Sequence, residues 1–137
     1  MSRAAITLLH LNGWVAVLIG SFIVLDPVSM LSSYGLQPAP STGLLSELRA
    51  PGGFLIASGL FIVRCALQRQ RYRQGFELSA LLYGGYGFSR LIAWVADGQP
   101  PEAIVIAAAI ELTLFAASLF MLMKGKEKNL YPAADLV

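Results

Sequence analysis

The stretch Ser79–Glu111, SALLYGGYGFSRLIAWVADGQPPEAIVIAAAIE, decides the fold of this chain. Two apolar runs are joined there by a short polar segment, Asp97–Glu102, which contains one glycine and two prolines. The first run carries one arginine, Arg90, and the second carries one glutamate, Glu111. An apolar run, a turn and a second apolar run predict a hairpin of two membrane helices, each with one charge in its interior.

The composition points to a lipid environment. The chain has 137 residues, enough for one domain, of which 56% are hydrophobic and only 13% are charged. Its mean hydropathy is +0.65, whereas a soluble domain carries roughly 25% charged residues. The net charge of +2 and the lack of a basic stripe exclude a nucleic-acid-binding protein. With one histidine and one cysteine, no metal site is expected.

Four apolar runs are long enough to cross a bilayer, which takes about 20 residues per helix. They cover residues 4–25, 48–67, 75–96 and 101–123. The chain is therefore predicted to be all-α, a single domain over residues 1–137 that forms an integral membrane, antiparallel four-helix bundle. The first run also resembles a signal peptide, but its length favours a retained span. Pro51 suits the first turn of the second helix; if that helix starts earlier, Pro51 kinks it instead.

The connecting segments and the basic residues predict a topology. The polar segment 26–46 separates the first two spans and contains a short interfacial helix over about residues 28–34. Residues 68–74 form a basic turn. With both termini cytoplasmic, eight of the ten Lys and Arg residues lie on the cytoplasmic side, as the positive-inside rule requires. The chain is predicted to be a multi-pass protein of the bacterial inner membrane.

The third run is amphipathic in the inverted sense, with a polar face toward the bundle and an apolar face toward lipid. The predicted inner face holds Ser79, Tyr83, Tyr86, Gly87, Arg90, Trp94 and Asp97. The predicted lipid face holds Leu81, Leu82, Phe88, Leu91, Ile92 and Val95. On the fourth run, small residues flank Glu111 on one face and allow a neighbouring helix to come close.

Arg90 and Glu111 lie at nearly the same depth when counted from the hairpin between them, within about 3 Å along the helix axes. An unpaired charge at that depth is costly, so the sequence predicts an ion pair between them. Glu47, Arg49 and Asp97 are expected to extend this pair into a cluster nearer the outer surface. The pair is either a structural clasp that fixes helix register, or a proton-active pair or head-group binding site.

Aromatic residues surround Arg90 in the sequence. Tyr83, Tyr86 and Trp94 are either packing and interface residues or the walls of a pocket for a flat ring such as a quinone. His10 and Cys65 fit structural roles between helices. No Ser-His-Asp or Cys-x-x-Cys arrangement is present in the sequence, so no catalytic residue is predicted.

Four motifs carry a resemblance to a known family. They are ELRAPGG at Glu47–Gly53, GFSRL at Gly87–Leu91, DGQP at Asp97–Pro100, and Glu111 in the last run. The chain resembles a family of small bacterial four-helix membrane proteins of unknown function. That family is distantly similar to the DoxX-like group, whose members include a subunit of a quinone-reducing oxidase. The resemblance implies the four-helix fold and points to Glu47, Arg49, Arg90, Asp97 and Glu111, but it implies no activity.

Three functions are consistent with the sequence. The first is a non-enzymatic accessory subunit or binding module, with a polar core of Arg49, Tyr86, Arg90 and Glu111 that opens toward the outer leaflet. Lipid, quinone or a partner helix would fill this core, and the partners would be membrane lipids, a larger membrane complex or further copies of the chain. The second is a quinone-linked oxidoreductase component, in which Arg90 holds a quinone oxygen and Glu111 handles the proton. The third is a small transporter that works as an oligomer.

Overall fold

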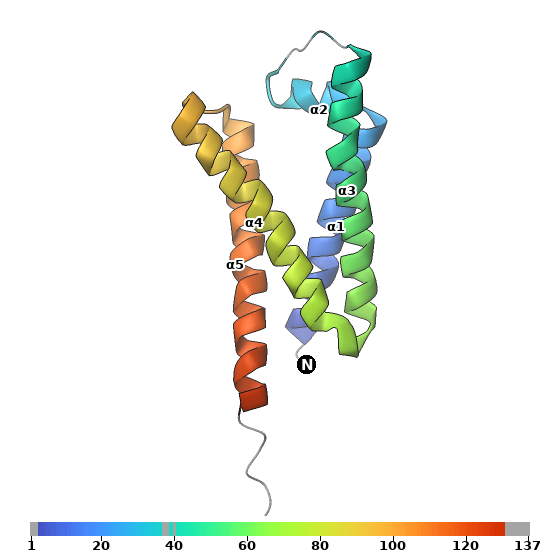
Figure 1. Cartoon of the computed structure of the whole chain (residues 1–137), viewed down its shortest axis with the longest axis vertical. Coiled ribbons are helices and arrows are strands. Elements are labelled where there is room, and N and C mark those ends of the chain that lie inside the picture. The colour runs from blue at the N-terminus through green and yellow to red at the C-terminus, as the bar shows by residue number, and fades with distance from the viewer. Residues whose placement is uncertain (1–2, 37–38, 40, 131–137) are drawn as a thin grey trace, which may run out of the picture.

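A computed structural model describes residues 3–36, 39 and 41–130, and every regular element in this part of the chain is helical (Figure 1). In chain order the helices are α1 (Arg3–Leu25), α2 (Pro27–Ser33), α3 (Thr42–Leu67), the short 3-10 helix η1 (Arg69–Arg71), α4 (Tyr72–Asp97) and α5 (Glu102–Leu130). The all-α prediction is confirmed for the described residues.

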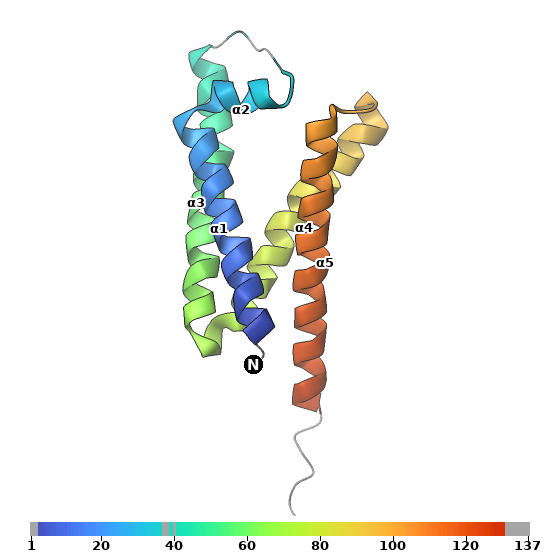
Figure 2. The ribbon, with the colours of Figure 1, turned by 180° about the vertical axis from the view of Figure 1, so that it is seen from behind.

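The four long helices alternate in direction and form two antiparallel pairs. α1 packs along α3, and α5 packs along α4 (Figures 1 and 2). α4 starts beside the end of α3 and leans away from it, so the two pairs diverge toward the end of the molecule that carries α2. The arrangement is more open than the bundle that the sequence predicts, and it leaves room between the pairs at the α2 end.

Glycines bring α1 and α3 into backbone contact. A Cβ atom added to Gly59 would lie 2.6 Å from the Gly13 carbonyl oxygen, and one added to Gly20 would lie 2.6 Å from the Gly52 carbonyl oxygen. No side chain fits at such distances. The paired glycines therefore fix the register of the two antiparallel helices, as small residues do at helix contacts inside membranes.

α3 begins earlier than the apolar run suggests. Its first residue is Thr42 rather than residue 48, and the Ser41 hydroxyl caps it by accepting a hydrogen bond from the Leu44 N–H at 3.2 Å. A serine in this position satisfies a free N–H of the first turn. Pro51 thus lies inside the helix, so its predicted place in the first turn is wrong. Because proline has no N–H, the Glu47 carbonyl lacks its usual helical donor.

Two connections between the helices agree with the sequence. The expected short helix over residues 28–34 is α2, and the Asp26 carboxylate caps it by accepting from the Ser29 N–H at 3.1 Å. The polar segment after Asp97 forms the tight turn between α4 and α5. Gly98 has φ of +96° there, a conformation that favours glycine. The basic connection between α3 and α4 is shorter than predicted, because α4 already begins at Tyr72.

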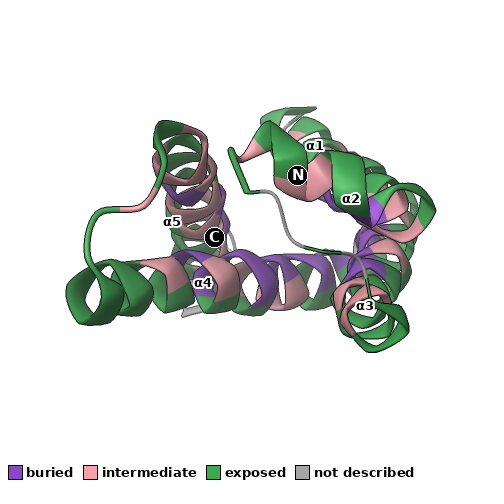
Figure 3. Ribbon diagram, turned by 90° about the horizontal axis from the view of Figure 1, so that it is seen from above, coloured by how far each residue is buried: buried purple, intermediate pink, exposed green. Residues whose placement is uncertain are grey.

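The surface of the molecule is strongly apolar. α1, α3 and residues 102–125 of α5 are long and apolar enough to cross a membrane. α4 does not meet that criterion, because glycines, tyrosines and Arg90 dilute its apolar residues. Even so, Leu81 and Val95 on α4 are 73% and 90% exposed, and much of the outer surface of each helix is open (Figure 3). Such a surface is typical of a membrane protein.

Candidate binding pocket

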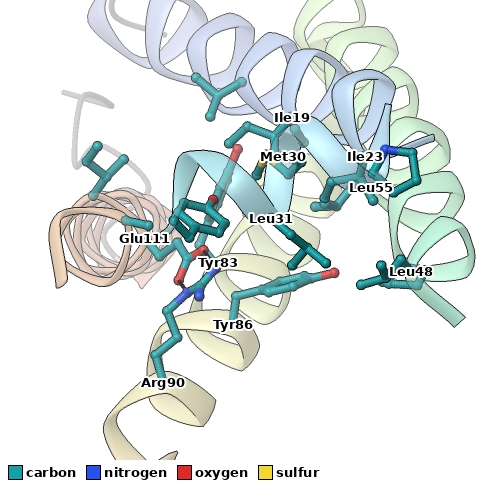
Figure 4. Close-up of a pocket in the computed structure, with 17 residues that line it drawn as sticks. Ile19, Ile23, Met30, Leu31, Leu48, Leu55, Tyr83, Tyr86, Arg90 and Glu111 are labelled. Carbon is teal, nitrogen blue, oxygen red and sulfur yellow. Dashed lines mark hydrogen bonds and ion pairs between the residues drawn. The ribbon is translucent and has the colours of Figure 1, made fainter. Parts of the chain in front are cut away.

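Arg90 on α4 and Glu111 on α5 form a two-pronged ion pair (Figure 4). The Arg90 Nε donates to Glu111 Oε2 at 2.8 Å, and Nη2 donates to Oε1 at 3.2 Å. The Arg90 side chain is 25% exposed and the Glu111 side chain is 14% exposed, so both charged groups are largely buried within the protein. The ion pair that the sequence predicts is present, and its two charges neutralise each other.

The α4 glycines allow α5 to come close enough for this contact. A Cβ atom on Gly84 would lie 2.9 Å from Phe115 Cδ2, and one on Gly87 would lie 2.8 Å from Leu112 Cδ2. Phe88 adds an edge-to-face contact with Phe115, with ring centroids 5.3 Å apart. These contacts hold the two helices together next to the ion pair, on the side away from the turn between α4 and α5, so its geometry rests on packing as well as on charge.

A pocket of about 240 Å³ lies between the two helix pairs and ends at this ion pair (Figure 4). α1 and α3 supply apolar walls, among them Ile19, Ile23 and Leu55. α2 contributes Met30 and Leu31. The polar groups gather on the side of α4 and α5, with one further tyrosine that follows α2. They are Tyr34, Tyr83, Tyr86, Arg90 and Glu111.

The polar side of the pocket is rich in hydrogen-bond donors. A guanidinium has five N–H groups, and the ion pair uses two of those on Arg90. The hydroxyls of Tyr34 and Tyr86 have no hydrogen-bond partner within the part of the chain that the structure describes. Burial raises the pKa of Tyr34, with the Arg90 charge opposing this shift and the Glu111 charge adding to it. Its hydroxyl therefore stays protonated at neutral pH.

A buried polar cluster ties the two helix pairs together beyond the pocket. The Tyr83 hydroxyl donates to the Asn12 backbone carbonyl. The Asn12 Nδ2 donates to Ser118 Oγ at 2.9 Å, and the Ser118 hydroxyl donates to the Leu114 carbonyl at 2.7 Å. Asn12 and Ser118 are fully buried. The Asn12 Oδ1 has no partner among the described residues.

The sequence interpretation missed this cluster because it did not single out Asn12. A signal was available, since an amide in the middle of the apolar run of residues 4–25 needs a partner on another helix. Ser118 falls on the same face of α5 as Glu111, and this face turns inward, since Ser118 is fully buried.

Of the eight predicted site residues, four line the pocket: Tyr83, Tyr86, Arg90 and Glu111. The other four do not. Trp94 and Asp97 are exposed because α4 leans away from the other pair at this end, and Glu47 is exposed on α3. Arg49 is also exposed and its Nε donates to the Val24 carbonyl at 3.1 Å. The predicted cluster of Glu47, Arg49 and Asp97 around the ion pair is therefore wrong.

The described residues hold no group of three or more His, Cys, Asp or Glu side chains placed to bind a metal ion. Cys65 is buried near the end of α3, and His10 is half-buried on α1.

Comparison with known proteins identifies a family. A family model described as a domain of unknown function (DUF4345) matches residues 5–122. This range contains α2, α3, α4, most of α1 and α5, and every residue of the pocket. Comparisons with curated proteins and with solved structures find no match.

Proposed function

This chain belongs to the DUF4345 family, a family of unknown function, and we propose that it is an integral membrane protein that binds one lipid-like molecule. It would act as a binding module or a small accessory subunit rather than as an enzyme. The observation that carries the proposal is the pocket itself, whose apolar walls end at donor groups on α4 and α5 (Figure 4). Ligand sites are typically mostly apolar, with a few convergent polar groups that orient the ligand.

The size of the pocket limits what it holds. Its volume of about 240 Å³ exceeds the roughly 150 Å³ of a cavity that takes benzene. It is smaller than the roughly 300–1,000 Å³ of a site for a drug-sized molecule. One ring, or a polar head with the first part of an acyl chain, fits this volume. The remainder of a longer ligand would extend out of the pocket into the bilayer.

We also propose four spans with both termini in the cytoplasm of a bacterial cell. Two features support this topology. Arg3, Arg64, Arg71, Arg73 and Lys124 lie at the end of the molecule opposite α2. The α2 end carries Asp26, Glu47, Asp97 and Glu102. The positive-inside rule then places α2 and the nearby pocket in the outer half of the membrane.

Accessibility of introduced cysteines tests this topology. In a Cys65→Ser background, Gln99→Cys lies in the turn between α4 and α5, and Gln74→Cys lies in the first turn of α4. Both positions are exposed. A membrane-impermeant maleimide is expected to label Gln99→Cys on intact spheroplasts and Gln74→Cys only after permeabilisation. The reverse pattern would invert the topology, and labelling of both without permeabilisation would exclude α4 as a span.

Filling the pocket is expected to remove bound lipid without unfolding the protein. Ala107 on α5 lines the pocket, whereas Ala116 on the same helix is exposed. We expect Ala107→Phe to lose most of the small molecules that mass spectrometry finds in the purified wild-type protein, because the new ring occupies their volume. Ala116→Phe, the matched control, is expected to keep them. Equal lipid content in the two variants would contradict a function for this pocket.

A quinone-linked oxidoreductase component is the second candidate function. The placement of Tyr86 beside Arg90 in one pocket favours it, because a ring lying against Tyr86 would bring an oxygen close to the guanidinium (Figure 4). Arg90 would hold that oxygen, and Glu111 would accept or release the proton. The same mass spectra separate the two candidates: a quinone in the wild-type extract that Ala107→Phe lacks would favour the second.

A further inference from the structure

We infer that the ligand of this pocket is an electrically neutral molecule that presents acceptor oxygens, such as the carbonyl of a lipid ester, and not an anion such as a fatty acid or a phosphate. This inference rests on the proposed binding function and narrows it to a chemical class. It follows from two properties of the site, the balance of charge at Arg90 and Glu111 and the surplus of donors around them.

The first property is that the charges at the site already cancel. Both Glu111 oxygens accept from Arg90, at 2.8 and 3.2 Å. Among the described residues one further ion pair is present, between Arg73 and Glu77 at the start of α4, and it lies far from the pocket. A ligand carboxylate would therefore enter as an uncompensated charge, or it would have to displace Glu111 from Arg90. Either event is costly where water is scarce.

The second property is that the remaining polar groups offer hydrogens. Arg90 keeps three N–H groups beyond the two that Glu111 accepts. Tyr34 and Tyr86 line the same pocket, and neither hydroxyl bonds to another described residue. A neutral carbonyl oxygen accepts from such donors without adding charge. A neutral head that carries only donors would leave the N–H groups of Arg90 unmatched.

The pair methyl palmitate and palmitate tests this inference, because the two differ only at the head. Binding of each radiolabelled probe to the detergent-solubilised protein is measured against empty micelles, at a pH that ionises the free acid. We expect the ester to bind about tenfold or more tightly than the carboxylate. As the pH falls and the acid becomes neutral, the two affinities are expected to converge. This pH dependence is measured on the wild-type protein alone.

Glu111→Gln supplies a charge-specific test. It removes the negative partner and leaves Arg90 as an unbalanced cation, so the preference is expected to reverse in favour of palmitate. Tighter binding of palmitate than of the ester to the wild-type protein at high pH would overturn the inference and leave the proposed function standing. If neither probe binds the wild type, or if Ala107→Phe binds the ester as well as the wild type does, the proposed function itself fails.

Discussion

Truncation of either partner of the Arg90–Glu111 pair is expected to destabilise the protein by about 3 kcal/mol. Arg90→Ala leaves the carboxylate of Glu111, 14% exposed, without its cation, and Glu111→Ala leaves the guanidinium of Arg90, 25% exposed, without its anion. The double variant removes both charges. It is expected to lose less than the sum of the single losses, with a coupling energy of about 2 kcal/mol. Unfolding in mixed detergent micelles measures all four free energies.

The chain offers a matched control on the same helix. Arg73 and Glu77 form an ion pair at 2.8 Å with side chains that are 68% and 46% exposed. The same three variants at this pair are expected to change the free energy of unfolding by about 0.5 kcal/mol or less. Additive losses at Arg90 and Glu111 would show that the two charges do not depend on each other. The predicted preference for neutral ligands would lose its basis as well.

Alanine at Gly59 or Gly20 is expected to push α1 and α3 apart, with a loss of about 2–3 kcal/mol. The added Cβ atom would lie 2.6 Å from a backbone carbonyl oxygen of the facing helix at both positions, Gly13 for Gly59 and Gly52 for Gly20. Backbone cannot rotate away as a side chain can. The strain should therefore exceed the gain of about 0.5–1 kcal/mol that alanine brings to a helix. Thermal unfolding in detergent measures the balance.

Gly53 and Gly85 serve as controls because a Cβ atom at either would meet nothing within 4 Å. Gly53→Ala and Gly85→Ala are expected to raise stability slightly, by about 0.5 kcal/mol, through helix propensity alone. A stable Gly59→Ala protein would mean that the two helices are farther apart than the structure places them. Loss of stability at Gly53 or Gly85 would instead reveal a neighbour that covers these faces.

The helices of this chain could be predicted well where the signal is local. Apolar runs mark the four long helices, the polar segment after residue 25 marks the end of α1, and the segment after Asp97 marks a turn. Which helix face points inward is harder to predict, because lipid is as apolar as a protein core. Leu82 illustrates this limit: it was placed on the lipid face of α4, and it is 4% exposed.

The charged residues of the site could be predicted from the sequence, but its apolar walls could not. Arg90 and Glu111 were found because a charge in an apolar run demands a partner and their depths match. The apolar walls were not found, since Ile19, Ile23 and Leu55 look like any other membrane residues. The sequence also contains no local signal for the lean of α4, because the direction of a helix depends on the other helices that it contacts, here mainly α5 and α3. That lean both opens the pocket and carries Asp97 away from it.

The pairing of the helices also has a consequence for how the chain would be inserted into the membrane during synthesis. α1 and α3 interlock through glycines, and α4 and α5 meet through glycines, the Phe88–Phe115 contact and one ion pair, so each helix pair has close contacts of its own. If α4 spans the membrane, as proposed above, it would alone carry an unmatched cation into the bilayer, because Arg90 leaves the ribosome ahead of Glu111. The insertion machinery would therefore have to hold α4 until α5 follows, and release both as one neutral unit.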